Sequence, residues 1–110
     1  MAKHVLVALT NAAEGKDEEF NSWYEDHLQD LLKLPGFVSV QRYRLSDAQN
    51  SPVTPYRYLA IYELDTEDLE ASMAALGARA GGMNWSLLDT NTLLVNAFTA
   101  FGPLRMAGEA

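Results

Sequence analysis

The sequence contains no cysteine, no long hydrophobic run and no cluster of basic residues. Without cysteine, the chain has no disulfide framework, no thiolate nucleophile and no thiolate metal ligand. The apolar run near the start, residues 5–9, is too short for a signal peptide or a membrane span. The formal net charge is −7, so neither nucleic acid nor an anionic membrane is an expected partner. These absences predict a cytoplasmic protein.

Motifs for common cofactors and nucleophiles are also missing. His4 and His27 are the only histidines, and they do not form a His-x-His or His-x-x-x-His pair. Gly81-Gly82 follows a predicted helix rather than a strand and has no Lys-Ser or Lys-Thr nearby, so it does not predict a phosphate-binding loop. No Gly-x-Ser-x-Gly motif occurs. We therefore expect neither a metal nor an organic cofactor.

The remaining pattern predicts one domain, residues 1–110, of alternating strands and helices. Short β-branched and aromatic runs predict strands, and apolar residues at helical spacing predict two helices. Asp17 lies at the positive end of the first helix dipole, and Asp65 is expected to cap the second helix. The predicted strands are 4–10, 37–45, 56–64 and 92–101; the predicted helices are 17–34 and the segment from 65 to Gly81-Gly82.

The order is therefore β-α-β-β-α-β, which predicts an α+β, ferredoxin-like domain: a four-stranded antiparallel sheet with two helices on one face. The other face of such a sheet is bare unless something covers it. Here both faces of the strands are apolar, for example Leu6 and Ala8 against Val5 and Val7. A sheet with one wet face alternates more cleanly. We therefore expect a homodimer that covers the second face.

The first predicted helix carries a histidine on its apolar face. At about 100° per residue, His27 falls on the same side as Phe20, Trp23, Tyr24 and Leu28. A buried imidazole needs a polar partner, because an unsatisfied buried polar group costs roughly 1–3 kcal/mol. The pattern indicates a candidate functional site around His27 but does not indicate which reaction occurs there.

Two segments carry a family resemblance. The run Glu19-Phe20-Asn21-Ser22-Trp23-Tyr24-Glu25-Asp26-His27-Leu28, followed by Leu34-Pro35-Gly36-Phe37-Val38 and Gln41-Arg42-Tyr43-Arg44, resembles the EthD-like branch of the dimeric α/β-barrel superfamily. The resemblance is close in the first half of the chain and limited to element order in the second. It implies a ferredoxin-like subunit whose sheet closes a barrel with a second copy. It also implies a pocket for a small molecule, either between the helices and the sheet or within the barrel. The superfamily includes cofactor-free cyclases, isomerases, monooxygenases and haem enzymes, so it implies architecture more than function.

The candidate site follows from these residues. His27 is the candidate general acid/base, because an imidazole titrates near neutral pH. Tyr24 and Tyr62 are candidate hydrogen-bond donors to a carbonyl or enolate oxygen. The candidate substrate contacts are Trp23, Arg42, Tyr43 and Trp85.

Each candidate also has a structural reading. His27 could be a satisfied core histidine, and Trp23 and the tyrosines could be core packing. Arg42 falls on the same side of its predicted strand as Val38 and Val40. It could form salt bridges with the acidic surface instead of reaching the pocket. Trp85 could plug the end of the core rather than cover a cavity. Which strand face lies beside His27 decides whether Arg42 or Tyr43 shares its space.

Two hypotheses about function follow. In the first, a cofactor-independent homodimer with a small hydrophobic pocket performs proton-transfer chemistry, as an isomerase, cyclase or lyase, on a small carbonyl-bearing or aromatic metabolite. In the second, the chain binds a small hydrophobic molecule or dimerises without catalysis. Substitution of His27 separates the two, since only the first has turnover to lose.

Overall fold

The computed structural model describes residues 2–80 and 82–108, and its elements follow the predicted order. Four strands and two helices form the fold, with a short 3₁₀ helix before the last strand. Their bounds are β1 Lys3–Thr10, α1 Asp17–Leu31, β2 Phe37–Arg44, β3 Tyr58–Asp65, α2 Leu69–Ala80, η1 Trp85–Leu87 and β4 Leu94–Thr99.

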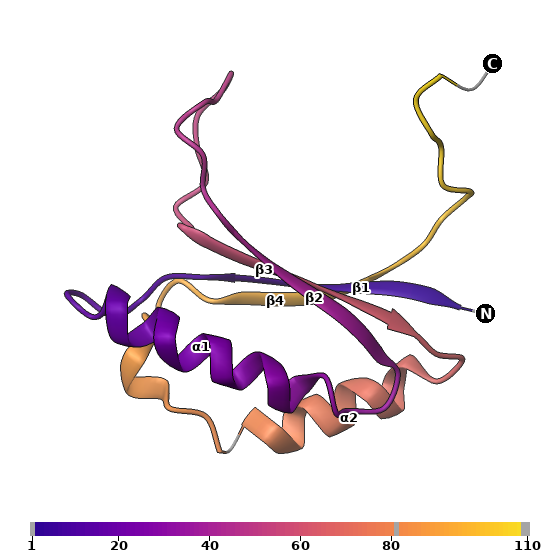
Figure 1. Ribbon diagram of the computed structural model, residues 1–110, viewed down its shortest axis with the longest axis horizontal. Helices are drawn as coiled ribbons and strands as arrows, with labels where there is room; N and C mark the ends of the chain where they lie inside the picture. The colour runs from indigo at the N-terminus through magenta and orange to yellow at the C-terminus, as the bar shows by residue number, and fades with distance from the viewer. Residues whose placement is uncertain (1, 81, 109–110) are drawn as a thin grey trace.

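The strands form one antiparallel sheet in the order β2-β3-β1-β4. Both helices lie on the same side of this sheet, and no helix among the described residues covers the opposite side (Figure 1). The predicted ferredoxin-like fold is therefore confirmed. Neither helix in the described part of the chain has the length and the apolar composition that a membrane span requires.

The core lies between the sheet and the helices. Residues from the helix-facing side of β1 and β3 pack against α1, η1 and the segment next to it. The fully or nearly buried apolar side chains are Leu6, Ala8, Ala12, Phe20, Tyr24, Leu28, Leu31, Ala60, Tyr62, Leu64, Leu87 and Leu88. The predicted apolar face of α1 is thus buried, except that Trp23 and His27 lie at its edge and are half-buried.

Acidic residues mark the start of helix α1, and a turn that contains Gly36 follows its end. Asp17, Glu18 and Glu19 occupy its first turn, where the positive end of the helix dipole stabilises carboxylates. The helix ends at Leu31, three residues before the predicted end, and two turns lead to Gly36. Gly36 has a φ of +83° and lies so close to Ser72 and Thr66 that a Cβ atom would collide with them.

The predicted cap of α2 was wrong. Asp65 does not cap α2, because β3 continues through it and it pairs in register with Lys3. Asp68 is the cap instead: its Oδ1 accepts the backbone N–H of Ala71 at 3.1 Å. Gly81, predicted to end this helix together with Gly82, lies outside the described residues.

A bulge in β2 changes which side chains face the helices. The register shifts between Phe37 and Ser39, so Phe37 faces the helices and its ring contacts that of Tyr62 at 5.9 Å between centroids. Val38, expected on the same side as Val40, is exposed instead. After the bulge the alternation holds, and Arg42 lies opposite Ala60 on the helix-facing side.

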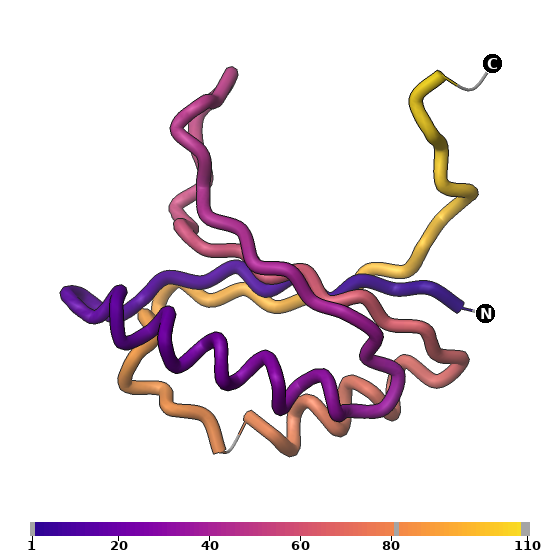
Figure 2. The backbone as a smooth tube through the Cα atoms, in the orientation of Figure 1, coloured from indigo at the N-terminus to yellow at the C-terminus, as the bar shows by residue number. Residues whose placement is uncertain are grey.

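Two segments leave the sheet on its bare side. The β2–β3 connection, residues 45–57, and the C-terminal segment, residues 100–108, both extend away from the helices (Figures 1 and 2). We call them the hairpin arm and the tail arm. Almost every residue in them is exposed.

Candidate functional site: a histidine cleft between the helices

A cleft of about 270 Å³ opens between the two helices and contains His27. Its volume suits a small metabolite and lies just below the range of about 300–1,000 Å³ that is typical of ligand pockets. Helix α1 contributes one wall, and the end of α2 with the segment after it contributes the other. The described lining residues are Trp23, Asp26, His27 and Asp30 from α1, and Ala78, Arg79, Gly82 and Met83 from the opposite wall.

The His27 ring is held by two aromatic neighbours one turn earlier in α1. It stacks on Trp23, with 4.7 Å between ring centroids and 13° between planes. The ring of Tyr24 meets it edge-on at 5.6 Å. Residues three and four positions apart lie on the same face of a helix, which places both rings against the imidazole. His27 is thus fixed in orientation while it lines the cleft.

The protonation of His27 depends on burial and on an ion pair in the cleft. Burial lowers the pKa of His27 below its usual 6.5, because the charged form loses hydration. Asp30 opposes this effect, and Arg79 reinforces it. Arg79 and Asp30 form a salt bridge of 3.1 Å across the cleft. Near neutral pH the imidazole is therefore unprotonated and able to accept a proton.

Two buried phenols lie behind His27. The hydroxyls of Tyr24 and Tyr62 are 3.4 Å apart, and both side chains are almost inaccessible to solvent. Burial raises the pKa of both groups, most strongly for Tyr62, so both are neutral at physiological pH. Their hydroxyls point to each other, and neither residue lines the cleft. The contact with Tyr62 therefore fixes the position of the Tyr24 ring, which in turn contacts His27.

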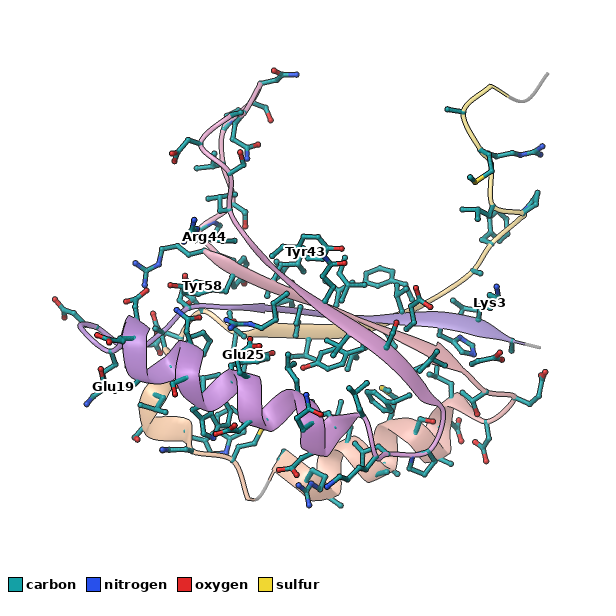
Figure 3. The ribbon with its side chains drawn as sticks, in the orientation of Figure 1. Lys3, Glu19, Glu25, Tyr43, Arg44 and Tyr58 are labelled. Atoms are coloured by element: carbon teal, nitrogen blue, oxygen red, sulfur yellow. The ribbon has the colours of Figure 1, made fainter. Side chains whose placement is uncertain are left out.

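Arg42 packs against the Tyr24 ring and forms hydrogen bonds with polar side chains of α1. Its guanidinium carbon lies 4.5 Å from the centre of the Tyr24 ring. The same group donates to Asn21 Oδ1 at 2.7 Å and to Glu25 Oε2 at 3.1 Å. Glu25 projects from α1 toward the sheet (Figure 3). The salt-bridge reading of Arg42 is confirmed, and the strand face nearer His27 is the one that carries Arg42.

Tyr43 lies on the other face of the sheet. Its side chain is exposed, and it projects on the side away from α1 (Figure 3). In register it lies beside Leu59 on β3. Tyr43 therefore does not share a space with His27.

Trp85 is the first residue of η1 and is hydrogen-bonded to the last residue of α2. Its indole N–H donates to the carbonyl of Ala80 at 3.1 Å, and the side chain remains partly exposed. It is not among the residues that line the cleft. Of the seven predicted site residues, Trp23 and His27 line the cleft, Tyr24, Tyr62 and Arg42 lie behind it, and Tyr43 and Trp85 lie elsewhere.

Sequence reasoning missed the opposite wall of the cleft. Arg79 lies almost fifty residues from Asp30, and nothing in the local pattern links the two. The one available signal is weak: Asp30 follows His27 by three positions, which places it on the same helix face. A second depression, of about 330 Å³, is lined by polar residues such as Asn11 and Asp17 and contains no predicted site residue.

Among residues 2–80 and 82–108, no group of three or more His, Asp or Glu side chains is placed to hold a metal ion. His4, the second histidine, is a structural residue: its Nε2–H donates to the carbonyl of Thr66 at 3.1 Å, and Nδ1 accepts the hydroxyl of Thr99 at 2.9 Å.

Comparison with solved structures identifies the fold. SnoaB from Streptomyces nogalater, a cofactor-independent oxygenase, is 20% identical with a TM-score of 0.67, over 96% of this chain and 100% of that one. An EthD family protein from Bacillus halodurans is 18% identical with a TM-score of 0.61, over 92% and 100%. A dabb family protein with a ferredoxin-like fold, from Mesorhizobium loti, is 13% identical with a TM-score of 0.61, over 93% and 100%.

The chain has the fold of these proteins. The resemblance predicted from the first helix is thus confirmed at the level of architecture. No family model and no curated protein matches the sequence. At these identities the comparisons establish the fold, and the chemistry has to be argued from the site.

Proposed function

We propose that the chain is a cofactor-independent enzyme that transfers a proton to or from a small carbonyl-bearing or aromatic metabolite bound in the His27 cleft. The observation that carries this proposal is an oriented, half-buried imidazole that lines a cleft of metabolite size. Its lowered pKa keeps it in the base form at neutral pH. A general base is most effective when its pKa lies near the working pH, its side chain is unprotonated and its orientation is fixed.

The other residues have supporting roles in this proposal. Trp23 offers an aromatic surface to the substrate, while Tyr24 holds the imidazole, and Tyr62 holds Tyr24. Arg79 is the one cationic side chain among the described residues that line the cleft. It is available to stabilise negative charge that develops on a carbonyl oxygen as His27 removes a neighbouring proton. The reaction class is an isomerisation, cyclisation or elimination that begins with this step.

The experiment measures deuterium uptake. Small aromatic ketones, lactones and 1,3-dicarbonyl compounds are incubated with the protein in D₂O, and mass spectrometry follows exchange at the carbon next to the carbonyl. We expect catalysed exchange for a subset of these compounds, and its loss in His27→Gln. His4→Gln is the matched control, because it changes the other histidine and leaves the cleft intact. Exchange that survives in His27→Gln contradicts the proposal.

Non-catalytic binding of a small molecule is the second candidate function. The observation that favours it is that the Tyr24 and Tyr62 hydroxyls bond to each other rather than point into the cleft. The cleft then offers one base and no phenol donor. Binding of a compound without deuterium exchange would support this second function.

The functional unit in this proposal is a homodimer formed through the bare face of the sheet. The central strands present apolar residues on that face, including Val7, Leu9, Leu59 and Ile61. Phe98 on β4 is 58% exposed and lies beside Val5 in register. A contiguous apolar surface of this kind is typical of an interface. A second copy brings an identical surface, as a twofold dimer requires.

A further inference from the structure

The two arms stand at opposite corners of the sheet. The hairpin arm leaves the β2/β3 side at the end marked by Arg44 and Tyr58, whereas the tail arm leaves β4, the other edge strand, after Thr99. Because the strands are antiparallel and in register, Thr99 lies beside His4, at the opposite end of the sheet from Tyr58. Both arms rise from the bare face (Figure 1).

The arms carry apolar side chains that their own subunit does not cover. In the tail arm, Phe101 and Leu104 are 103% and 85% exposed. In the hairpin arm, Val53 is 56% exposed. Isolated exposed apolar residues are ordinary, but these are concentrated in two segments that border the apolar face of the sheet. The apolar surface is therefore continuous with the face that we assign to the dimer.

The placement of the arms fits a second copy of this chain. A twofold axis that lies above the bare face, parallel to the sheet and either along or across the strands, moves each arm to a neighbouring corner. The partner's arms then fall on the two corners that the first subunit leaves empty. Four arms fill four corners without collision, which closes the assembly at two subunits.

We propose that the hairpin and tail arms embrace the second subunit, so that each subunit is held by the sheet face and by the partner's two arms. This proposal rests on the proposed dimer but makes a separate claim, since a face-to-face dimer can form with its arms in solvent. Phe101 and Leu104 are the residues expected to become buried.

The absence of cysteine in the sequence allows a direct test. A nitroxide spin label is attached to Leu104→Cys, and its mobility is measured in the dimer and after dilution below the dimer Kd. We expect an immobilised label in the dimer and a mobile one in the monomer. A label on Gln29→Cys, on the exposed surface of α1, is the matched control and should not respond. Sedimentation at the same concentrations reports the oligomeric state independently.

A second measurement tests the contribution of the tail to affinity. We expect the double variant Phe101→Ser, Leu104→Ser to raise the dimer Kd at least tenfold, whereas Arg105→Ser, in the same tail, changes it less than twofold. A dimer with a mobile label at 104 and an unchanged Kd in the double variant overturns the arm proposal and leaves the dimer standing. A chain that stays monomeric at all concentrations overturns both.

Discussion

A histidine acts as a base only when its environment keeps it unprotonated and oriented, and both conditions hold at His27. The stack on Trp23 and the edge contact with Tyr24 fix the ring. Partial burial lowers its pKa. Such shifts are frequent at functional sites, where burial and charged neighbours adjust protonation.

The charges in the cleft should tune this pKa in opposite directions. Arg79→Gln removes a cation that lowers the pKa of His27, so we expect the pKa to rise. Asp30→Asn removes an anion that raises it, so we expect the pKa to fall. Proton NMR titration of the His27 ring measures the pKa in both variants and in the parent chain. If both variants move the His27 pKa in the same direction, the electrostatic account of the cleft is wrong.

Acidification should weaken the fold through the same residue. His27 has a lower pKa in the folded than in the unfolded chain, so the unfolded chain binds more protons below pH 6.5. The free energy of unfolding therefore decreases as the pH falls from 6.5 toward the folded pKa. We expect His27→Gln to show a smaller decrease over this range in urea titrations at several pH values. An equal or steeper decrease in the variant would refute this linkage.

The phenol pair should limit stability at alkaline pH. Burial raises the pKa of Tyr24 and Tyr62 in the folded state, so the stability that they contribute is present below pH 10 and is lost as the pH rises above it. We expect Tyr62→Phe to lose less stability between pH 9 and 11 than the parent chain. An alkaline loss in Tyr62→Phe equal to that of the parent chain would contradict this expectation.

At the scale of elements, Arg42 joins β2 to α1. It is 16% exposed, stacks on Tyr24 and bonds to Asn21 and Glu25 from the neighbouring helix. Only a planar guanidinium makes all of these contacts together, and lysine cannot replace it. We expect Arg42→Lys to lower the free energy of unfolding by about 1–2 kcal/mol.

Arg44, two residues along the same strand, provides the matched control for this prediction. Its side chain is exposed, so Arg44→Lys should change stability by less than about 0.5 kcal/mol. Urea unfolding of the two variants distinguishes the positions. Equal effects would show that Arg42 is an ordinary surface charge.

Element order and the buried face of α1 could be predicted from the sequence, because both depend on periodicity. Phe20, Tyr24, Leu28 and Leu31 recur at helical spacing and are buried as expected. The cap of α2 could not be predicted from local sequence, since Asp65 and Asp68 are both residues that favour a cap position. The pairing of β3 with Lys3 decides in favour of Asp68, and that pairing is a long-range contact.

The candidate site was predictable only where it depends on one helix. Trp23, Tyr24 and His27 lie close together because they are three and four residues apart. Arg79 was missed because its partner Asp30 lies on another element, and Val38 was misplaced because a bulge shifts the register of β2. Periodicity reports local geometry, whereas the cleft lies between two helices that are far apart in the sequence.

At the scale of the whole molecule, the sheet separates two surfaces with different roles. The helix side carries the His27 cleft, and the bare side carries the apolar face and the arms (Figure 1). A dimer through the bare face therefore leaves both clefts accessible. Each cleft is built from one subunit, so binding should not require the partner.

This separation predicts that the dimer can be broken without loss of the cleft. Ile61 lies at the centre of the bare face, between Val7 and Gln41 in register. We expect Ile61→Glu to give a folded monomer, because each dimer would bury two opposed carboxylates. Analytical ultracentrifugation measures the mass, with Gln29→Glu on the outer surface of α1 as the control. A dimeric Ile61→Glu would place the interface elsewhere.

The most direct test of the account is a crystal structure of the protein soaked with the compound that exchanges deuterium fastest. We predict density in the cleft between Trp23 and Arg79, with the exchanging carbon within about 3.5 Å of a His27 ring nitrogen. Density for the compound at any other site, with the His27 cleft left empty, would contradict the account.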